Sequence, residues 1–204
     1  MKNNNLLQLS EIICTRLSHD LIGNIGAVAN AIELLDDDPE SFADVKPILE
    51  LSSKVLSSRL KFFRLAFGLS NAAVKNIDEL KTIANNYLAT IGNRNFPINL
   101  NLFLNTPELY KIALLCIMTL SDVFIKGGTI EATETETGVT FKATSSHSLS
   151  ISKLQTLQNL LAGNIAEENP AQVAPLAYLQ AMLSSSDVKT NITFSELEAI
   201  LQIG

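Results

Sequence analysis

The stretch "TRLSHDLIGNIGAVANAIELLDDDP", residues 15–39, decides the fold of the N-terminal part of this chain. From position 9 onward, apolar residues recur at steps of three or four, a period typical of an amphipathic helix of about seven turns. The apolar stripe consists of Leu9, Ile13, Leu17, Leu21, Ile25, Val28, Ile32 and Leu35. The three acids and Pro39 that follow predict that the helix ends in a polar turn.

A second helix is predicted to begin near Pro47 and to end at Gly68, because proline suits a first turn and glycine suits a C-terminal cap. Its apolar residues are Ile48, Leu51, Val55, Leu56, Leu60, Phe62, Phe63, Ala66 and Phe67. The two helices would form an antiparallel hairpin whose apolar face is too wide for two helices to enclose. A second copy of the hairpin would cover that face, so we expect a homodimer with a four-helix bundle.

The pattern becomes mixed after the hairpin, and "GLSNAAVKN", residues 68–76, is the expected hinge. Helices are predicted at 77–91, 109–124, 150–162 and 170–183, and strands at 98–104, 129–135, 139–146 and 188–194. This mixture indicates an α+β region in which helices cover one mixed sheet. We therefore expect two domains, residues 1–69 and 76–204.

The composition limits the classes of function. With a net charge of -6 and a pI of about 4.9, the chain lacks the basic surface that a general nucleic-acid binder needs. Its apolar runs are shorter than the roughly 20 residues that span a bilayer, and its N-terminus lacks a secretory signal pattern, so we expect a cytoplasmic protein without a membrane partner. Cys14 and Cys116 have no pairing or metal-ligand spacing, and we interpret both as reduced core thiols.

His19 is one of two histidines in the chain. It lies two residues from both Leu17 and Leu21, roughly 200° around the helix from each, so its ring is predicted to face solvent. A neutral imidazole can attack through one nitrogen while a carboxylate holds the proton on the other. Asp20 is the candidate carboxylate, and the alternatives are a solvated helix acid or an ion-pair partner.

Gly23 and Gly26 follow on the same helical face as His19, although each glycine costs about 1 kcal/mol relative to alanine inside a helix. Their missing side chains would let the backbone of another protein approach the imidazole. Close packing against a neighbouring helix and a local bend are the alternatives. Counting equally along both helices from a turn near residue 40 places Lys61 and Arg64 at the level of His19. The alternatives for these two cations are an ion pair with Asp20, attraction of a phosphoryl group, or a plain surface position.

Three segments carry a resemblance to a known family: "LSHDLIGNIGAVANAIELLDDDP" (17–39), "RLKFFRLAFG" (59–68) and "LSDVFIKGGTI" (120–130). They resemble the phosphoacceptor and ATP-binding regions of bacterial two-component histidine kinases and, more closely, the ChpT-like histidine phosphotransferases. The resemblance implies a dimeric bundle of helical hairpins joined to a degenerate ATPase-like α/β sandwich.

The chain departs from the kinases where they bind nucleotide. The helix "KIALLCIMTLSDVF" (111–124) has no Asn box, with Asp122 near the place of an Asn, and "TSSHSLSI" (144–151) has neither acid nor glycine after its strand. The resemblance therefore implies that ATP binding is lost. The kinases also place Thr or Asn four residues after the histidine to orient a water; here Gly23 stands there and Asn24 follows, so we expect no intrinsic phosphatase activity.

The resemblance implies a phosphotransferase of a phosphorelay rather than an ATP-dependent kinase. His19 would accept a phosphoryl group from the receiver aspartate of a hybrid histidine kinase and pass it to a response-regulator receiver, with Asp20 orienting the ring. No cofactor would be held, since the receiver brings Mg²⁺. Receiver docking is assigned to Arg16, Ile22, Gly23, Asn24, Gly26, Lys61 and Arg64.

Two rival functions and one rival acceptor remain open. The first rival is an active histidine kinase, and the second is a dimeric adaptor in which His19 has lost its chemical role. His147, in the sequence "SSHSL", is the rival phosphoacceptor, and a loop histidine among serines is more simply interpreted as facing solvent.

Overall fold

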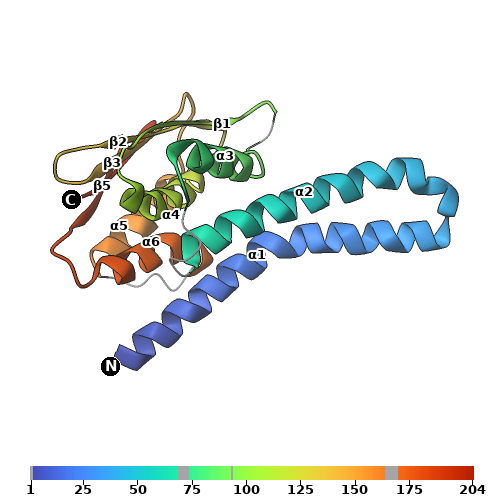
Figure 1. The fold of residues 1–204 in the computed structure, drawn as a ribbon, viewed down its shortest axis with the longest axis horizontal. Coiled ribbons are helices and arrows are strands. Elements are labelled where there is room, and N and C mark those ends of the chain that lie inside the picture. The colour runs from blue at the N-terminus through green and yellow to red at the C-terminus, as the bar shows by residue number, and fades with distance from the viewer. Residues whose placement is uncertain (1, 69–73, 93, 164–169) are drawn as a thin grey trace.

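The computed structural model describes residues 2–68, 74–92, 94–163 and 170–204 of the chain. Two helices form a long hairpin that projects from a sheet covered by helices (Figure 1). We call residues 74–204 the C-terminal region. The predicted boundaries at 69 and 76 stay a prediction, because most of the expected hinge lies outside the described residues.

The hairpin consists of α1 (Lys2–Asp37), a 3-10 turn η1 (Pro39–Ser41) and α2 (Phe42–Phe67). The prediction that the second helix begins near Pro47 is wrong, because the chain turns earlier. The Asp38 side chain accepts from the Glu40 backbone N–H at 3.1 Å, and Pro39 takes the first position of the turn. Pro47 therefore lies inside α2, where it cannot donate the usual bond to the Ala43 carbonyl.

Each half of α1 has a different neighbour (Figure 1). The N-terminal half lies along α6 (Pro170–Leu183) of the C-terminal region, and the other half packs on α2. The helix changes direction between the two halves. Cys14, beside the stripe residue Ile13, is exposed, so its assignment to the core is wrong, whereas Cys116 is buried and burial raises the pKa of its thiol.

The C-terminal region is a mixed sheet with helices on one face, as predicted. Its helices are α3 (Ile77–Leu88), the 3-10 turn η3 (Pro107–Leu109), α4 (Tyr110–Ser121), α5 (Ile151–Leu161) and α6. Its strands are β1 (Ile98–Phe103), β2 (Gly128–Glu134), β3 (Val139–Thr144), β4 (Thr190–Phe194) and β5 (Glu198–Ile203). The sheet order is β1-β2-β3-β5-β4, with β1 and β2 parallel and the other neighbours antiparallel.

The strand at the C-terminal end is a correction to the sequence analysis, which placed the last strand at 188–194. β5 follows β4 and inserts between β4 and β3. Its residues Ala199, Leu201 and Ile203 are buried while their neighbours in the strand are more exposed. This alternation is the ordinary signal of a strand with one buried face, and it is readable in the sequence.

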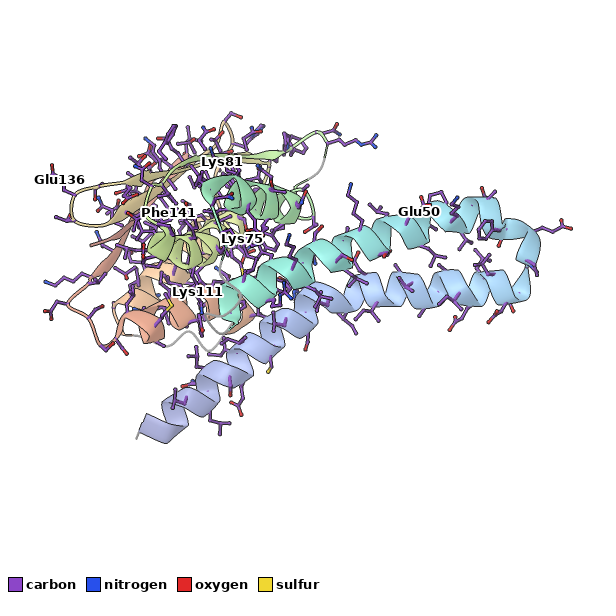
Figure 2. All side chains as sticks on the ribbon, in the orientation of Figure 1. Glu50, Lys75, Lys81, Lys111, Glu136 and Phe141 are labelled. Atoms are coloured by element: carbon purple, nitrogen blue, oxygen red, sulfur yellow. The ribbon has the colours of Figure 1, made fainter. Side chains whose placement is uncertain are left out.

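The core lies between the sheet and α4, which is buried along nearly its whole length. Val139, Phe141 and Ala143 of β3 all point into it, and Figure 2 labels Phe141 there. The end of α2 enters the same core: the Phe62 ring stacks on Tyr87 with centroids 3.8 Å apart. The hairpin is thereby packed into the C-terminal region and not merely joined to it.

A polar contact closes the same junction. Lys111 of α4, labelled beside the end of α2 in Figure 2, donates from Nζ to the Gly68 carbonyl at 2.7 Å. Among the described helices, none is both long enough and apolar enough to cross a bilayer.

Candidate functional site

His19 lies in α1 at the level where the hairpin leaves the C-terminal region. Its side chain is 77% exposed, so the prediction that the ring faces solvent is confirmed. Its Nδ1 lies 3.1 Å from Oδ1 of Asp20. The two nitrogens of an imidazole point in different directions, and a partner at Nδ1 leaves Nε2 on the exposed side of the ring.

Asp20 makes contacts through both of its carboxylate oxygens. While Oδ1 meets the histidine, Oδ2 accepts from Nε of Arg16 at 2.7 Å. The Asp20 side chain is only 13% exposed. Two of the open interpretations therefore hold together, because Asp20 contacts the imidazole and is also an ion-pair partner.

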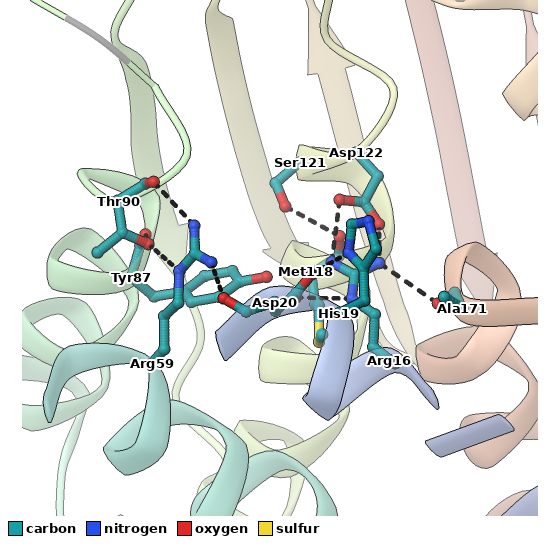
Figure 3. A network of polar contacts seen from close by, with 10 residues as sticks. All are labelled: Arg16, His19, Asp20, Arg59, Tyr87, Thr90, Met118, Ser121, Asp122 and Ala171. Atoms are coloured by element: carbon teal, nitrogen blue, oxygen red, sulfur yellow. Dashed lines mark hydrogen bonds and ion pairs between the residues drawn. The ribbon is translucent and has the colours of Figure 1, made fainter. Parts of the chain in front are cut away.

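Arg16 links Asp20 to the C-terminal region (Figure 3). Its guanidinium engages the Asp122 carboxylate with both terminal nitrogens, Nη2 to Oδ1 at 3.1 Å and Nη1 to Oδ2, and Nη1 lies 3.4 Å from the Ala171 carbonyl. Burial opposes the charge, yet the carboxylates of Asp122 and Asp20 raise the pKa of Arg16 above its usual range. The assignment of Arg16 to receiver docking is wrong, because it is 6% exposed and its donors face inward.

Arg59 of α2 is a site residue that the sequence analysis missed. It donates to the backbone carbonyl of Asp20, and it also reaches Oγ1 and the carbonyl of Thr90, each at 3.1 Å. Lys61 and Arg64, expected at this level, are exposed, and the cation that pairs with Asp20 is Arg16. Counting from the turn near residue 40 identified the correct level of α2. The residue that contacts α1 at this level is Arg59, two positions before Lys61.

Asp122 is held by a second cation. It is the C-cap residue of α4, and Nζ of Lys153 donates to its backbone carbonyl at 2.7 Å. Tyr87 is buried close to the same guanidinium, where burial raises the pKa of its hydroxyl and the Arg16 charge opposes that rise. The tyrosine therefore stays neutral and adds no negative charge beside the carboxylates.

The helical face beyond His19 is open. Among the described residues, no atom outside α1's own neighbouring backbone lies within 4 Å of a Cβ built on Gly23 or Gly26. Ile22 is an exposed large apolar residue, and Asn24 is half-buried. Close packing against another helix of the same chain therefore does not explain the two glycines.

His147, the rival acceptor, has different surroundings. Its Nδ1 lies 3.2 Å from Oγ of Ser146, and its ring meets the Phe96 ring edge to face, with centroids 6.1 Å apart. It borders an open hollow of about 420 Å³ that Phe96 and Lys126 also line. The exposed His147 thus contacts a hydroxyl and a phenyl ring, whereas His19 contacts a carboxylate.

Comparison with solved structures identifies the fold. A bacterial phosphotransferase solved at 1.7 Å superposes on this chain with a TM-score of 0.74 and 21% sequence identity, over 97% of this chain and 96% of that chain. This chain has the fold of that phosphotransferase. The superposition covers the hairpin and the C-terminal region together, so the likeness is one of the whole architecture.

A second likeness comes from sequence. The chain is 34% identical over 83 residues to the protein phosphotransferase ChpT of Brucella abortus (strain 2308). The match covers 40% of this chain and 39% of ChpT. The resemblance to ChpT-like phosphotransferases is therefore confirmed. No family model matches the chain.

The buried ion pair predicts a large loss of stability when its cation is removed. Arg16→Met leaves the carboxylates of Asp20 and Asp122 without their shared partner in a largely buried site. Breaking a buried pair from one side costs about 3–5 kcal/mol of unfolding free energy. Urea denaturation followed by circular dichroism measures that loss.

Lys61→Met is the matched control, because Lys61 is an exposed cation in the same hairpin. Its unfolding free energy should stay within about 0.5 kcal/mol of the parent value. Equal urea midpoints for Arg16→Met and Lys61→Met would contradict a stabilising role for the Arg16 pair.

Proposed function

We propose that this protein is a histidine phosphotransferase of a two-component phosphorelay, with His19 as the phosphoacceptor. The observation that carries the proposal is the exposed imidazole whose Nδ1 lies against Asp20, 3.1 Å away. The proposed phosphodonor is the receiver domain of a hybrid histidine kinase, and the proposed phosphoacceptors are response-regulator receivers. The place of action is the cytoplasm, where these receivers occur.

The Asp20 carboxylate favours the tautomer of His19 with the proton on Nδ1, which leaves the lone pair of Nε2 exposed. Nε2 attacks the phosphorus of the receiver's aspartyl phosphate. An N–P bond forms, the P–O bond to the receiver carboxylate breaks, and that carboxylate leaves with the electron pair. Asp20 then stabilises the positive charge of the phosphorylated ring.

Transfer out of the protein is the reverse of this step. The carboxylate of a second receiver attacks phosphorus, the N–P bond breaks, and neutral His19 is restored with its proton still on Nδ1. The receiver brings the Mg²⁺ that neutralises its own acyl phosphate, so this chain supplies a nucleophile, its orientation and a docking surface.

The docking surface is proposed to be the part of α1 that carries Ile22, Gly23, Asn24 and Gly26, with Lys61 and Arg64 on the neighbouring helix. The open space around both glycines supports it, because a close approach of a partner's backbone needs such space. A receiver carries acidic residues at its phosphorylation site, and exposed cations on α2 would attract them.

An ATP-dependent kinase is the weaker candidate. Asp122, near the place where kinases carry an Asn, is engaged by Arg16 and so is not available to a nucleotide-bound metal.

His19→Gln tests the phosphoacceptor. A phosphorylated receiver is incubated with the purified chain, and we expect wild type to gain a phosphoryl group that is labile in acid and stable in base. Glutamine has no nucleophilic nitrogen, so label on the variant should fall to background, whereas the matched variant His147→Gln should label like wild type. The measurement is phosphate incorporation resolved by Phos-tag electrophoresis.

Two results would overturn the proposal. Label that persists in His19→Gln would move the acceptor elsewhere. A wild-type chain that takes no label from any receiver but binds them would favour the dimeric adaptor.

Gly23→Ala separates docking from folding. Alanine should raise the unfolding free energy by about 0.5–1 kcal/mol, because glycine weakens a helix interior and the space around Gly23 is open. The added methyl should clash with a docked receiver, at a cost of roughly 1–3 kcal/mol, so that transfer falls about tenfold. Asn30→Ala, also exposed on α1, is the control that improves helix propensity without slowing transfer. A Gly23→Ala protein that is more stable and transfers at the parent rate would remove Gly23 from the docking surface.

We also propose that the protein is a homodimer through its hairpin. Both helices of the hairpin keep exposed apolar side chains in the single chain, among them Ile25 and Ile32 on α1 and Ile48 and Leu51 on α2. Apolar surface on this scale is typical of an interface between copies.

The double variant Ile25→Asp/Ile32→Asp tests the dimer. These residues are seven apart, on one face of α1, and two buried carboxylates would disfavour association. At micromolar concentration, multi-angle light scattering should give twice the chain mass for wild type and the chain mass for the variant. Val188→Asp, which changes an exposed apolar residue of the C-terminal region, should stay dimeric. A monomeric wild type would contradict the proposal.

A further inference from the structure

We infer that Arg16 and Asp122 are positioning residues for phosphoryl transfer, which hold Asp20 against His19 from the C-terminal region. The inference rests on the proposed function, and it assigns to the C-terminal region a part in the chemistry. Neither residue would touch the phosphoryl group. They would act through the carboxylate that contacts the imidazole (Figure 3).

The contacts form one continuous chain from the C-terminal region to the histidine. Asp122 binds both terminal nitrogens of Arg16, Nε of the same guanidinium donates to Oδ2 of Asp20 at 2.7 Å, and Oδ1 of Asp20 meets His19 Nδ1 at 3.1 Å. A guanidinium is planar and presents its donors in a fixed fork. Asp122 therefore sets the plane of Arg16, and that plane sets the direction in which Nε meets Asp20.

Helix geometry alone does not bring Asp20 to the His19 ring. Neighbouring residues in a helix are turned about 100° from each other, and an aspartate side chain has several staggered rotamers. Arg16, four residues earlier on α1, takes one oxygen of Asp20 and leaves the other for the ring. Arg59 takes the backbone carbonyl of Asp20 from α2, so the residue is held at both its main chain and its side chain.

The site is shielded from water on the side away from His19. The side chains of Asp20 and Asp122 are 13% and 14% exposed, and Arg16 is buried. Charge-assisted hydrogen bonds in such a site compete little with solvent, so they restrict side-chain rotamers more strongly than surface pairs do. The exposed ring of His19 is thus attached to a rigid support.

The position of Asp122 is not explained by the stability of its own helix. A carboxylate at the C-cap of α4 lies next to the negative end of the helix dipole, which disfavours it. Arg16 from α1 and Lys153 from α5 supply the compensating positive charges. The acid at this position therefore serves a contact outside α4, and that contact is Arg16.

Asp122→Asn in the full chain tests the inference with two readouts. The first is the fraction of His19 rings that carry their proton on Nδ1 and not on Nε2, from ¹⁵N chemical shifts of the imidazole at about pH 8. We expect this fraction to fall, because an amide cannot hold both nitrogens of the Arg16 fork. The second is the rate of transfer from a phosphorylated receiver, which should fall about tenfold, as is common when an orienting partner is lost.

Two variants complete the design. Asp122→Glu keeps the carboxylate and should restore most of the tautomer fraction and of the rate. Glu198→Gln is the matched control, because it makes the same acid-to-amide change and removes the ion pair with Lys142, 2.6 Å long, on the sheet. It should leave both readouts at their wild-type values.

The outcomes are distinguishable. A wild-type tautomer fraction in Asp122→Asn overturns the inference, even if the rate falls, because Arg16 and Asp122 would then only hold the two parts of the chain together. If wild type takes no label from any receiver, the proposed function fails, while the tautomer readout still decides whether Asp122 positions the ring. If Asp122→Asn does not fold, Arg16→Lys carries the same test, since an ammonium keeps the charge without the fork.

Discussion

The buried guanidinium of Arg16 is the interaction on which the site depends. It lies between two carboxylates, one on its own helix and one at the end of α4, and it joins residues 106 positions apart in sequence. An ion pair so well shielded is stable only when every partner is in place. The pair therefore requires the hairpin and the C-terminal region to meet in one orientation, and the Phe62 ring stacked on Tyr87 supports the same orientation with apolar contact.

The C-terminal region has no nucleotide-binding motifs in its sequence, and in this arrangement its central helix contacts the hairpin. α4 keeps its buried, apolar character because the sheet needs a central helix, and the end of α4 presents Asp122 to the hairpin. The Asp122 carboxylate is thus engaged by a contact within the chain. The helix is fully packed although its sequence has no Asn box.

Much of the fold follows from local pattern. The apolar periods predicted the hairpin, the helix at 109–124, the strands at 129–135 and 139–146 and the solvent-facing ring of His19, because helix and strand geometry fix which residues share a face. The errors have local causes as well. α2 begins at the Asp38–Pro39 turn and not at Pro47, and the alternation in β5 was overlooked. Cys14 was assigned to the core although it lies one position from the stripe.

The sequence by itself determined the helix that carries His19 and the outward direction of its ring, since both depend on spacing within one helix. It offered Asp20 as a candidate partner of the ring, and the contact itself depends on the residues that hold Asp20. Only the tertiary structure decided which cation holds that carboxylate. The sequence offers Lys61 and Arg64 as the cations for Asp20, whereas the packing of α1 along α6 and the contact with Asp122 bury Arg16 beside Asp20 and leave the other two exposed. Asp122 and Arg59 are further examples, because a contact between distant segments depends on how whole elements pack, and no local period records it.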